Sequence, residues 1–375
     1  MTKNLSMPSN TLGSNFSLLS FGESHGKCIG AIVDGCPAGL QLSELDIQPF
    51  LDLRKPGQSV ITTQRKEEDV VTILSGVFNG YTTGAPICMI IWNKDSDSRS
   101  YDVFRTKPRP GHADYTGIVK YGGFNDYRGS GRFSGRLTAT IVMGGAIALK
   151  ILKKYLNIEV ISYTKSIGDI SLDTREMPFQ LLRENRYSND VRCPDNRTAQ
   201  KMKESILTAR RDGDSLGGVI EGIIQNVPPG LGEPIFESLE SEISRGLFSI
   251  PAVKGVEFGS GFFGSSIRGS INNDSFILDP QSNTIRTKSN NSGGILGGIS
   301  DGMPITFRVA FKPAASIPKP QKTVDLGSMS EAELTVGGRH DPCVVPRAPP
   351  VIDSIAGIIL LDNCLKCNLI PRVLH

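Results

Sequence analysis

The sequence predicts an α+β fold built as one domain. Runs of apolar residues with helical spacing are interleaved with short strand-like runs, but the two kinds do not alternate regularly. A doubly wound or barrel fold needs that alternation, with helices of about 10 to 15 residues between its strands. The 375 residues would allow one large domain or two ordinary ones, and no linker or repeat divides them. We therefore expect a single domain over residues 1–375, with residues 1–9 as a flexible extension.

Five segments carry helix signals. The clearest is residues 43–53, where Ser43 and Asp46 have the spacing of a capping box and a Pro-Gly pair ends the pattern. Residues 135–156 are apolar almost all round and include several small residues, which indicates a buried helix that its neighbours approach closely. The remaining helical patterns are residues 196–211, 236–248 and 352–364.

Six runs rich in β-branched and other apolar residues predict strands. A proline directly after Phe311 ends the last of them. The six runs are residues 31–34, 70–78, 87–92, 219–227, 256–258 and 305–311.

Charge and composition exclude one broad class of function. The 41 basic and 38 acidic residues give a net charge of +3, too balanced for the wide basic surface of a nucleic-acid-binding protein. Any site for an anion must therefore be local. Glycine is enriched, at 41 of 375 residues or about 11%, which indicates many turns or close backbone contacts.

The cysteines and the N-terminus favour a cytoplasmic protein. The seven cysteines are scattered and odd in number, unlike the dense spacing of a secreted disulfide framework. Cys364 and Cys367 form one CxxC pair without the further ligands that a zinc site requires, so we expect no metal. Residues 1–15 lack the apolar core of a signal peptide. No run approaches the ~18 apolar residues of a membrane span, so we expect no membrane partner. The balanced charge likewise leads us to expect no nucleic acid as a partner.

The first candidate site is the glycine-rich run FGESHGK at 21–27, for which three interpretations stay open. Gly22, Ser24 and Gly26 have the GxSxG spacing of a serine-hydrolase nucleophile elbow, although so short a preceding chain cannot supply the strands that come before an elbow in that fold. A phosphate-binding P-loop would need one more residue and a Ser or Thr after its lysine. The third interpretation is a turn that aims His25 at an anionic ligand.

Two further runs combine arginine with glycine. Residues 109–115, RPGHADY, present an arginine and His112 on a turn fixed by proline and glycine, where Asp114 could orient the imidazole. Residues 128–136, RGSGRFSGR, lead directly into the buried helix. Backbone N–H groups at a helix start and guanidinium forks both suit phosphate oxygens, so this run is a candidate anion cradle. A plain basic surface turn is the alternative.

A fourth run, GGRHDPC at 337–343, again combines a cation, a histidine and a carboxylate, and Arg347 follows it. Residues 293–298, GGILGG, indicate close backbone approach to a flat group, and residues 312–316, KPAAS, place a lysine at a strand end. The shared theme of arginine, histidine and glycine points to a small polyanionic ligand rather than to nucleic acid or sugar.

Together and in this order, the motifs resemble those of the chorismate synthase family. The resemblance runs from about residue 10 to residue 359, and eight motifs in one order exceed what chance would give. The six residues before Met7 extend past the usual start of the family, which makes Met7 a candidate initiator. The motifs are FGESHG, RKPGQS at 54–59, TTQR at 62–65, RPGHADY, GRFSGR at 131–136 followed by GGAIA, AVKGVEFG at 252–259, GGILGGIS at 293–300 and GRHDPC at 338–343.

The resemblance implies a carbon–oxygen lyase of the shikimate pathway, which leads to the aromatic amino acids. Its reaction converts 5-enolpyruvylshikimate 3-phosphate to chorismate by a 1,4-anti elimination of the 3-phosphate and a hydrogen from C6, with no net redox change. The family requires reduced FMN (FMNH2), which is expected to lend electron density to the substrate and to accept the C6 proton at N5. The resemblance also implies a layer of helices between two antiparallel β-sheets and a homotetramer. The flavin would be reduced either with NADPH by the enzyme itself or by a separate flavin reductase.

Carried over motif by motif, the resemblance also implies the site residues. His25 would be the general acid near the leaving phosphate, and His112 would protonate or steady the reduced flavin, since an imidazole with a pKa of about 6.5 suits both tasks near neutral pH. Asp341 would help the flavin N5 to lose its proton. The substrate-binding residues would be Ser24, Arg54, Arg109, Arg136 and Arg339. The FMN-binding residues would be Arg132, Phe133, Ser134, Ala252, Gly297, Lys312, Pro313, Ala314, Ala315, Ser316 and Arg339.

Some positions depart from the family pattern. Leu137 and Ile141 stand where an acidic and a basic residue are common, which suggests that apolar packing replaces an ion pair. Val60 stands where a second cation is common, which argues against NADPH use. Asp353 replaces a late glutamate and Ala314 replaces a threonine. None of these changes removes a proposed catalytic group.

Two alternatives from other classes stay open on the sequence alone. One is a serine hydrolase built on Ser24. The other is a non-catalytic relative that binds flavin or phosphate as a sensor, against which the intact His25, His112 and Asp341 argue.

Overall fold

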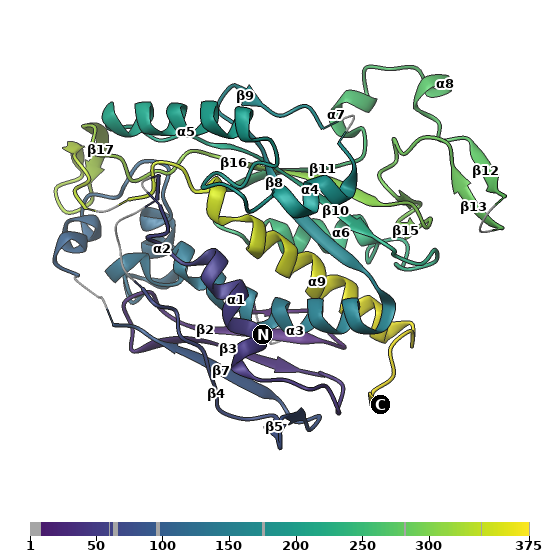
Figure 1. The fold of residues 1–375 in the computed structure, drawn as a ribbon. Helices are drawn as coiled ribbons and strands as arrows, with labels where there is room; N and C mark the ends of the chain where they lie inside the picture. Colours follow the sequence, from purple (N-terminus) through teal and green to yellow (C-terminus); the bar gives the residue numbers. More distant parts are fainter. Residues whose placement is uncertain are drawn as a thin grey trace, which may run out of the picture.

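Two antiparallel sheets enclose a layer of helices (Figure 1). The computed structural model describes residues 9–59, 61–62, 67–94, 98–174, 177–280, 283–338 and 340–374. The α+β class and the layered arrangement expected from the sequence are confirmed. One hydrophobic cluster contains side chains of both sheets and of the helices between them. The single domain over residues 1–375 stays a prediction, and residues 1–8 of the expected extension lie outside the described residues.

The N-terminal sheet presents the turn that carries the first sequence motif. The ring of Phe21 in one strand lies over Gly30 in the next, where a Cβ would be 2.2 Å from Phe21 Cζ. Ser24 and His25 lie in the turn that joins these two strands. The described strands are antiparallel, in the order β1 (Thr11–Leu12), β2 (Ser17–Gly22), β3 (Cys28–Asp34), β7 (Ile87–Trp92) and β4 (Thr72–Ile73).

The second sheet comes from the later part of the chain. In its described part the strands are antiparallel, in the order β11 (Val253–Phe258), β16 (Ile305–Phe311), β10 (Gly218–Gln225), β8 (Glu159–Ile167) and β9 (Ile170–Ser171). Along β16 buried residues alternate with half-buried ones, as in a strand with one face on the core. β8 is buried on both faces over most of its length, so no alternation marks it in the sequence.

The layer between the sheets contains α1 (Glu44–Arg54), α3 (Thr138–Leu156) and α9 (Pro349–Lys366). α3 and α9 pack against each other, and Gly145 permits the close approach, because a Cβ there would lie 2.1 Å from Ser354 Cβ. A 3-10 turn precedes α3 and another precedes α9: η3 (Gly135–Leu137) and η4 (Val345–Arg347). These turns place Arg136 and Arg347 at the same cavity.

Sequence signals that act locally agree with the structure. Ser43 and Asp46 form a capping box at the start of α1, and α5 (Asn196–Arg211) has the expected bounds. The expected single strand over residues 70–78 is wrong, because Gly76, with a φ of +84°, separates β4 from β5 (Val77–Phe78). A residue in this left-handed conformation turns the chain and ends the extended run.

The other described elements lie around the three layers. α5 packs on the outer side of β8 and β9, and α6 (Leu239–Leu247) packs against α9 and β11. An arm projects from the body with α7 (Gly261–Gly264), α8 (Gly269–Asn272), β12 (Phe276–Asp279) and β13 (Thr284–Thr287) (Figure 1). The rest are α2 (Asp114–Tyr121), α4 (Phe179–Asn185), β6 (Tyr81–Thr82), β14 (Ile295–Leu296), β15 (Ile299–Ser300), β17 (Gln321–Asp325), β18 (Ser330–Leu334), η1 (Arg99–Arg105) and η2 (Arg128–Phe133).

One helical stretch, Gly135–Leu156, has the length and apolar composition that a membrane span would need. The expectation that no run approaches this length is therefore wrong. Glycines and threonines interrupt the apolar residues of this helix and hide the run in the sequence, but they do not make the helix polar. Of its most apolar window, 78% is buried inside the molecule, so the apolarity serves packing between the two sheets.

Candidate active site

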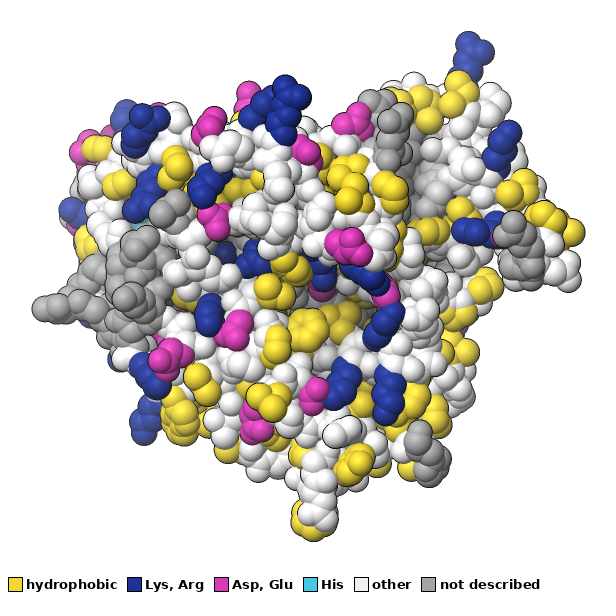
Figure 2. Space-filling view, in the orientation of Figure 1, with side chains coloured by type: hydrophobic (Ala, Val, Ile, Leu, Met, Phe, Trp, Pro, Cys, Tyr) yellow, Lys and Arg dark blue, Asp and Glu magenta, His cyan; other side chains and the backbone are white. Residues whose placement is uncertain are grey.

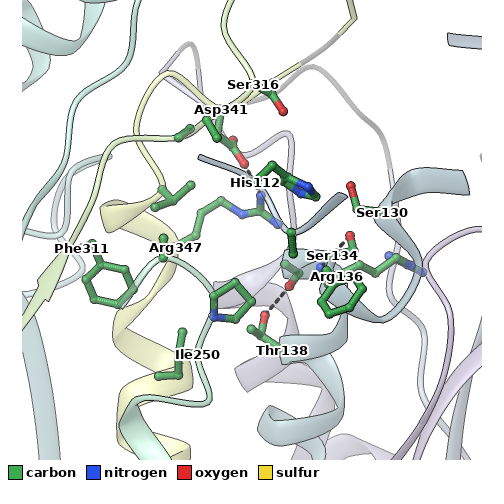
Figure 3. Close-up of a pocket in the computed structure, with 18 of the residues that line it drawn as sticks. His112, Ser130, Ser134, Arg136, Thr138, Ile250, Phe311, Ser316, Asp341 and Arg347 are labelled. Atoms are coloured by element: carbon green, nitrogen blue, oxygen red, sulfur yellow. Dashed lines mark hydrogen bonds and ion pairs between the residues drawn. The ribbon is translucent and has the colours of Figure 1, made fainter. Parts of the chain in front are cut away.

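A cavity of about 720 Å³ lies where the starts of α3 and α9 meet the start of β11 and the end of β16 (Figure 3). Its polar lining comes from the turns before α3 and α9 and from the loop before α2, and its apolar lining includes Ile250 and Phe311. Ligand sites in proteins commonly measure about 300 to 1,000 Å³ and combine an apolar wall with a few polar groups. This cavity therefore has the size and the lining of a site for small molecules.

The turn before α3 has an unusual backbone. Gly129, Ser130 and Gly131 all have a positive φ, at +57°, +68° and +50°. Gly129 is also required for space, because a Cβ there would lie 2.2 Å from the His25 ring. Ser130 Oγ accepts a hydrogen bond from Arg109 Nη2 at 2.9 Å, which holds the one non-glycine residue of the three. A left-handed conformation costs such a residue about 1–2 kcal/mol, and strain of this kind clusters at functional sites.

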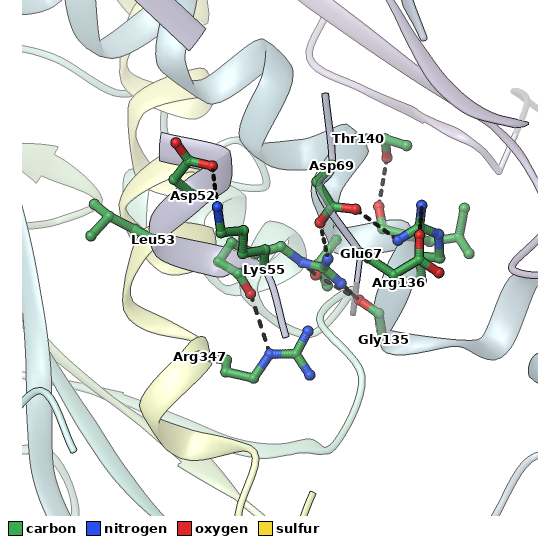
Figure 4. Close-up of polar contacts among 12 residues, drawn as sticks. Asp52, Leu53, Lys55, Glu67, Asp69, Gly135, Arg136, Thr140 and Arg347 are labelled. Carbon is green, nitrogen blue, oxygen red and sulfur yellow. Dashed lines mark hydrogen bonds and ion pairs between the residues drawn. The ribbon is translucent and has the colours of Figure 1, made fainter. Parts of the chain in front are cut away.

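Two guanidinium groups at the cavity share one buried carboxylate (Figure 4). Asp69 Oδ2 accepts a hydrogen bond from Arg54 Nη1 at 2.9 Å, and Asp69 Oδ1 accepts one from Arg136 Nη1 at 2.8 Å. Glu67 adds a second carboxylate, whose Oε2 lies 3.0 Å from Arg136 Nη2, near enough for an ion pair but not aligned for a hydrogen bond. All four side chains are buried. Three separate segments of the chain thus meet in one ion-pair cluster.

Neutral acceptors fix the rest of the Arg54 side chain. Its Nε donates to Thr138 Oγ1 at 3.0 Å, and its Nη2 donates to the backbone oxygen of Gly135 at 2.7 Å. Burial lowers the pKa of Arg54 to about 10, although the charge of Asp69 acts in the opposite direction. Arg54 therefore stays charged at neutral pH, and the cavity has a cation whose orientation is set before any ligand binds.

A second cluster joins the loop before α2 to the cavity. Arg109 contacts Asp114 twice, from Nε to Oδ2 and from Nη2 to Oδ1, each at 2.8 Å. His112 Nδ1 lies 2.7 Å from Asp114 Oδ1. Burial alone would raise the pKa of Asp114, but hydrogen bonds and charges from Arg109 and His112 outweigh it and hold this pKa well below its usual range. Arg109 Nη2 lies 3.1 Å from the same ring nitrogen, but its two hydrogens have closer acceptors in Asp114 Oδ1 and Ser130 Oγ, at 2.8 and 2.9 Å. The carboxylate therefore favours a proton on Nδ1, which leaves Nε2 of His112 to exchange protons.

A third cluster lies before α9. Arg347 Nη1 donates to Asp341 Oδ2 at 2.5 Å, and Arg347 Nε donates to the backbone oxygen of Arg54 at 3.2 Å (Figures 3 and 4). Arg347 thus ties Asp341 to the end of α1. His340 lines the cavity beside them, and burial lowers its pKa, which keeps its ring largely neutral at pH 7.

The segment after β16 lines the cavity and touches the loop before α2. Lys312 Nζ donates to the backbone oxygen of Gly111, and Ser316 Oγ accepts from Arg109 Nη1 at 2.9 Å. Ala252 lines the same part of the cavity with a φ of +73°, and its backbone oxygen accepts from the Lys312 N–H at 2.9 Å. The start of β11, the end of β16 and the loop before α2 are therefore joined at the cavity.

Ser24 and His25 lie behind the cavity wall rather than on it. The His25 ring lies against Gly129 and packs edge-on against Tyr101, with the ring centroids 5.2 Å apart, and both neighbours line the cavity. His25 Nδ1 is 2.9 Å from Ser98 Oγ. Ser24 is fully buried, and its Oγ has no hydrogen-bond partner among the residues that the structure describes. A buried polar atom without a partner is costly and calls for an explanation such as a ligand.

Most of the site residues expected from the sequence line this one cavity. Gly297 does not, since it lies in the turn between β14 and β15, and Ser24 and His25 stand behind the wall. Arg339 lies outside the described residues. Those that line the cavity are His112, Asp341, Arg54, Arg109, Arg136, Arg132, Phe133, Ser134, Ala252, Lys312, Pro313, Ala314, Ala315 and Ser316.

The sequence patterns missed the acidic residues of the site. Glu67 and Asp69 belong to a charged run after the TTQR motif, of which only Thr62 is described, and such runs usually lie on the surface. A signal was present in the arginines, because buried guanidinium groups require acidic partners. Within the described ranges, no group of three or more His, Cys, Asp or Glu side chains could hold a metal ion.

Known proteins of similar sequence agree on the family. A family model described as chorismate synthase matches residues 16–365. The chain belongs to the chorismate synthase family. A chorismate synthase of Dehalococcoides mccartyi is 54% identical over 98% of this chain and 99% of its own length. A chorismate synthase of Korarchaeum cryptofilum is 54% identical over 96% of this chain and 98% of its own. A chorismate synthase crystal structure matches with a TM-score of 0.74 at 31% identity, covering 95% of this chain and 93% of that one.

The structure bears on the serine-hydrolase alternative and on the positions that depart from the family pattern. A serine hydrolase needs an exposed nucleophile beside a histidine, whereas Ser24 Oγ is buried and makes no hydrogen bond to any histidine of the described chain. Leu137 belongs to the apolar core and Ile141 packs against it, as the replacement of an ion pair by apolar packing requires. Ala314 lines the cavity, and Val60 lies outside the described residues.

Asp69→Asn is expected to destabilise the protein strongly. The amide keeps the size of the side chain but removes the charge that Arg54 and Arg136 share, and breaking a buried ion pair costs about 3–5 kcal/mol. Asp52→Asn is the matched control, because Asp52 pairs with Lys55 at 45% side-chain exposure, where a pair contributes at most about 1 kcal/mol. Urea denaturation at pH 7 measures both. Equal stability of the two variants would contradict a central role of Asp69.

Proposed function

We propose that the 720 Å³ cavity is the site where this chain carries out the reaction of its family, the conversion of 5-enolpyruvylshikimate 3-phosphate to chorismate and phosphate. The observation that carries the proposal is the convergence of Arg54, Arg136 and Arg347 from three segments on one cavity. The substrate has a phosphate and two carboxylates, and guanidinium groups bind such oxyanions with paired hydrogen bonds.

The buried carboxylates leave the arginines able to bind a substrate. Arg54 uses three N–H groups in the contacts described above, and a guanidinium has five, so two remain for an anion. Arg136 is held in the same way, with Nε donating to Asn93 Oδ1 at 2.7 Å. Because their orientation is already fixed, these groups lose little conformational entropy on binding. We assign substrate binding to Ser24, Arg54, Arg109, Arg136 and Arg339.

The family is flavin-dependent, and we propose reduced FMN as the cofactor. The cavity measures about 720 Å³, and Lys312 adds a cation to its lining that suits a phosphate group. Arg132 also lines the cavity, while its Nη1 donates to the backbone oxygen of Gly22 at 3.2 Å and its Nη2 to Asn10 Oδ1 at 2.7 Å. When bound, reduced FMN would lend electron density to the substrate and take up its C6 proton. The residues that would hold it are Arg132, Phe133, Ser134, Ala252, Lys312, Pro313, Ala314, Ala315, Ser316 and Arg339, and Gly297, which does not line this cavity, is left out of the set. Because Val60 replaces a common cation, we propose a separate flavin reductase rather than NADPH bound to this chain.

The chain itself would hold and move protons at three side chains. His112 would do so at Nε2, since Asp114 holds the opposite ring nitrogen. His25 would act as the general acid toward the leaving phosphate across Gly129, which lines the cavity and has no side chain to separate the His25 ring from it. Asp341 would accept a proton in the position fixed by Arg347. Groups held this way contribute about 10²- to 10⁴-fold to a rate.

The reaction is tested by mixing the protein anaerobically with 5-enolpyruvylshikimate 3-phosphate and chemically reduced FMN. We expect chorismate, followed by its ultraviolet absorbance, and phosphate to appear in equal amounts, and neither to appear with oxidised flavin. Release of phosphate without chorismate would contradict an elimination. No product with flavin bound would favour the non-catalytic sensor.

His25→Ala and His112→Ala should each lower kcat by about 10²-fold or more, the loss typical of a positioned acid or base. Asp114→Asn should lower kcat more than it changes KM, because it disturbs the protonation of His112 without removing the imidazole. Asp52→Asn controls for the change of a carboxylate to an amide at a half-exposed position that does not line the cavity. Steady-state kinetics with reduced FMN measure all four variants. Unchanged turnover in either histidine variant would overturn its assigned role.

We also propose that the protein is a homotetramer. The projecting arm with α7, α8, β12 and β13 gathers exposed apolar side chains (Figure 2), including Phe262 at 82%, Phe276 at 66% and Leu278 at 65% exposure. A gathering of this kind is typical of a surface that another protein covers. Light scattering should give about four times the chain mass of 40.5 kDa, and a monomer at micromolar concentration would contradict the proposal.

The state of the cysteines supports a cytoplasmic location for the enzyme. All seven are free thiols, and four of them, Cys36, Cys193, Cys343 and Cys364, are buried. Free thiols in this number suit a reducing compartment.

A further inference from the structure

A second cavity of about 230 Å³ lies beside the proposed active site, and Arg347 lines both cavities. We propose that this smaller cavity is an oxyanion site that takes inorganic phosphate. Its lining is polar and includes Gln58, Ser59, Thr62, Asp190, Arg192 and Arg347. The argument rests on Arg192, which no sequence motif indicated.

Arg192 is a buried cation that lacks an ion-pair partner. The residue is 8% exposed, and no carboxylate of the described chain lies within 4.0 Å of its guanidinium. Its Nη2 donates to the backbone oxygen of Leu53 at 3.0 Å and to Gln58 Oε1 at 2.7 Å. Three of its five N–H groups therefore remain for a ligand. A buried charge without a partner is unfavourable, so an anion at this place would stabilise the folded chain.

The position of Arg192 is fixed before any ligand binds. Its φ is +62°, its N–H donates to the Asn189 oxygen at 3.2 Å, and its own oxygen accepts from the Thr164 N–H at 2.9 Å. The guanidinium lies over the Tyr187 ring, 4.7 Å from the ring centroid. Arg186 lies over the same ring at 4.6 Å. A site held in this way pays little entropy on binding.

Among the residues that the structure describes, the other charged groups near this cavity compensate one another. Arg186 pairs with Asp353 at 2.5 Å, Asp190 pairs with Lys203 at 2.7 Å, and Arg347 pairs with Asp341. The charge of Arg192 therefore remains as a net positive charge at the cavity. Hydroxyl groups of Ser59 and Thr62 line the same space. One net positive charge surrounded by N–H and O–H donors suits a tetrahedral oxyanion.

Phosphate is the ion that the proposed reaction releases, so this part of the inference rests on the proposed function. The two cavities meet at Arg347, whose Nη1 holds Asp341. Phosphate bound in the smaller cavity would attract Arg347 and so change how Arg347 holds Asp341. It would do this without occupying the place of the substrate. We therefore expect phosphate to inhibit turnover in a way that added substrate does not relieve.

The test is calorimetric titration of the full-length protein with inorganic phosphate at constant ionic strength. Phosphate can also enter the active site, so the titration is repeated with saturating 5-enolpyruvylshikimate 3-phosphate and oxidised FMN, which fill the larger cavity without turnover. Wild type should keep one phosphate site under these conditions, and Arg192→Gln should weaken it at least 10-fold. Arg197→Gln, which removes an exposed charge from the neighbouring helix α5, is the matched control and should keep the site.

Arg192→Lys provides a second variant in case Arg192→Gln does not fold. The ammonium keeps the charge but loses the planar fork, so phosphate should bind about 3- to 10-fold more weakly. Phosphate affinity equal to wild type in either folded variant, or equal weakening in Arg197→Gln, would overturn the proposal. If the substrate does not bind, that result contradicts the proposed active site and not the phosphate site. The titrations without substrate still show whether Arg192→Gln weakens phosphate binding.

Discussion

The cavity proposed as the active site depends on one buried carboxylate, that of Asp69. This side chain holds Arg54, at the end of α1, and Arg136, just before α3, each by a hydrogen bond shorter than 3 Å. Without it, the two guanidinium groups would repel each other in a place that little water reaches, and an uncompensated buried charge costs several kcal/mol. The cluster therefore fixes two elements of the helical layer at one edge of the cavity. It also concentrates two guanidinium groups at one cavity of a chain whose net charge is only +3.

The layered fold brings the remaining groups to the same place. α3 and α9 pack closely through Gly145, and the turns before them deliver Arg136 and Arg347 to one cavity. Each side chain proposed to handle a proton is held by a charged or polar partner rather than left in a mobile loop. Asp114 holds His112, and Arg347 holds Asp341. Such preorganisation is what allows a protein to orient a reactive substrate and cofactor with little rearrangement.

Sequence reasoning succeeded where the signal is local and failed where burial decides. The capping box of α1 and the bounds of α5 follow from neighbouring residues. β8 carries no alternation because both of its faces are buried, and only the tertiary structure creates that condition. The burial of Glu67 and Asp69 could not be predicted for the same reason. A run of charged residues indicates an exposed surface, and only the tertiary structure shows that arginines from other segments pair with these two carboxylates. The motifs named most of the residues around the cavity, but they did not reveal that Ser24 and His25 stand behind its wall.

Because Asp69 holds both Arg54 and Arg136, we expect the two arginines to bind the substrate as one unit. A double-mutant cycle on the dissociation constant of 5-enolpyruvylshikimate 3-phosphate, with Arg54→Gln, Arg136→Gln and the double variant, tests it most directly. If the two arginines act as a unit, either single substitution will cause most of the loss and the second will add little. The coupling energy should then reach about 1 kcal/mol or more. A loss in the double variant equal to the product of the two single losses would contradict the claim.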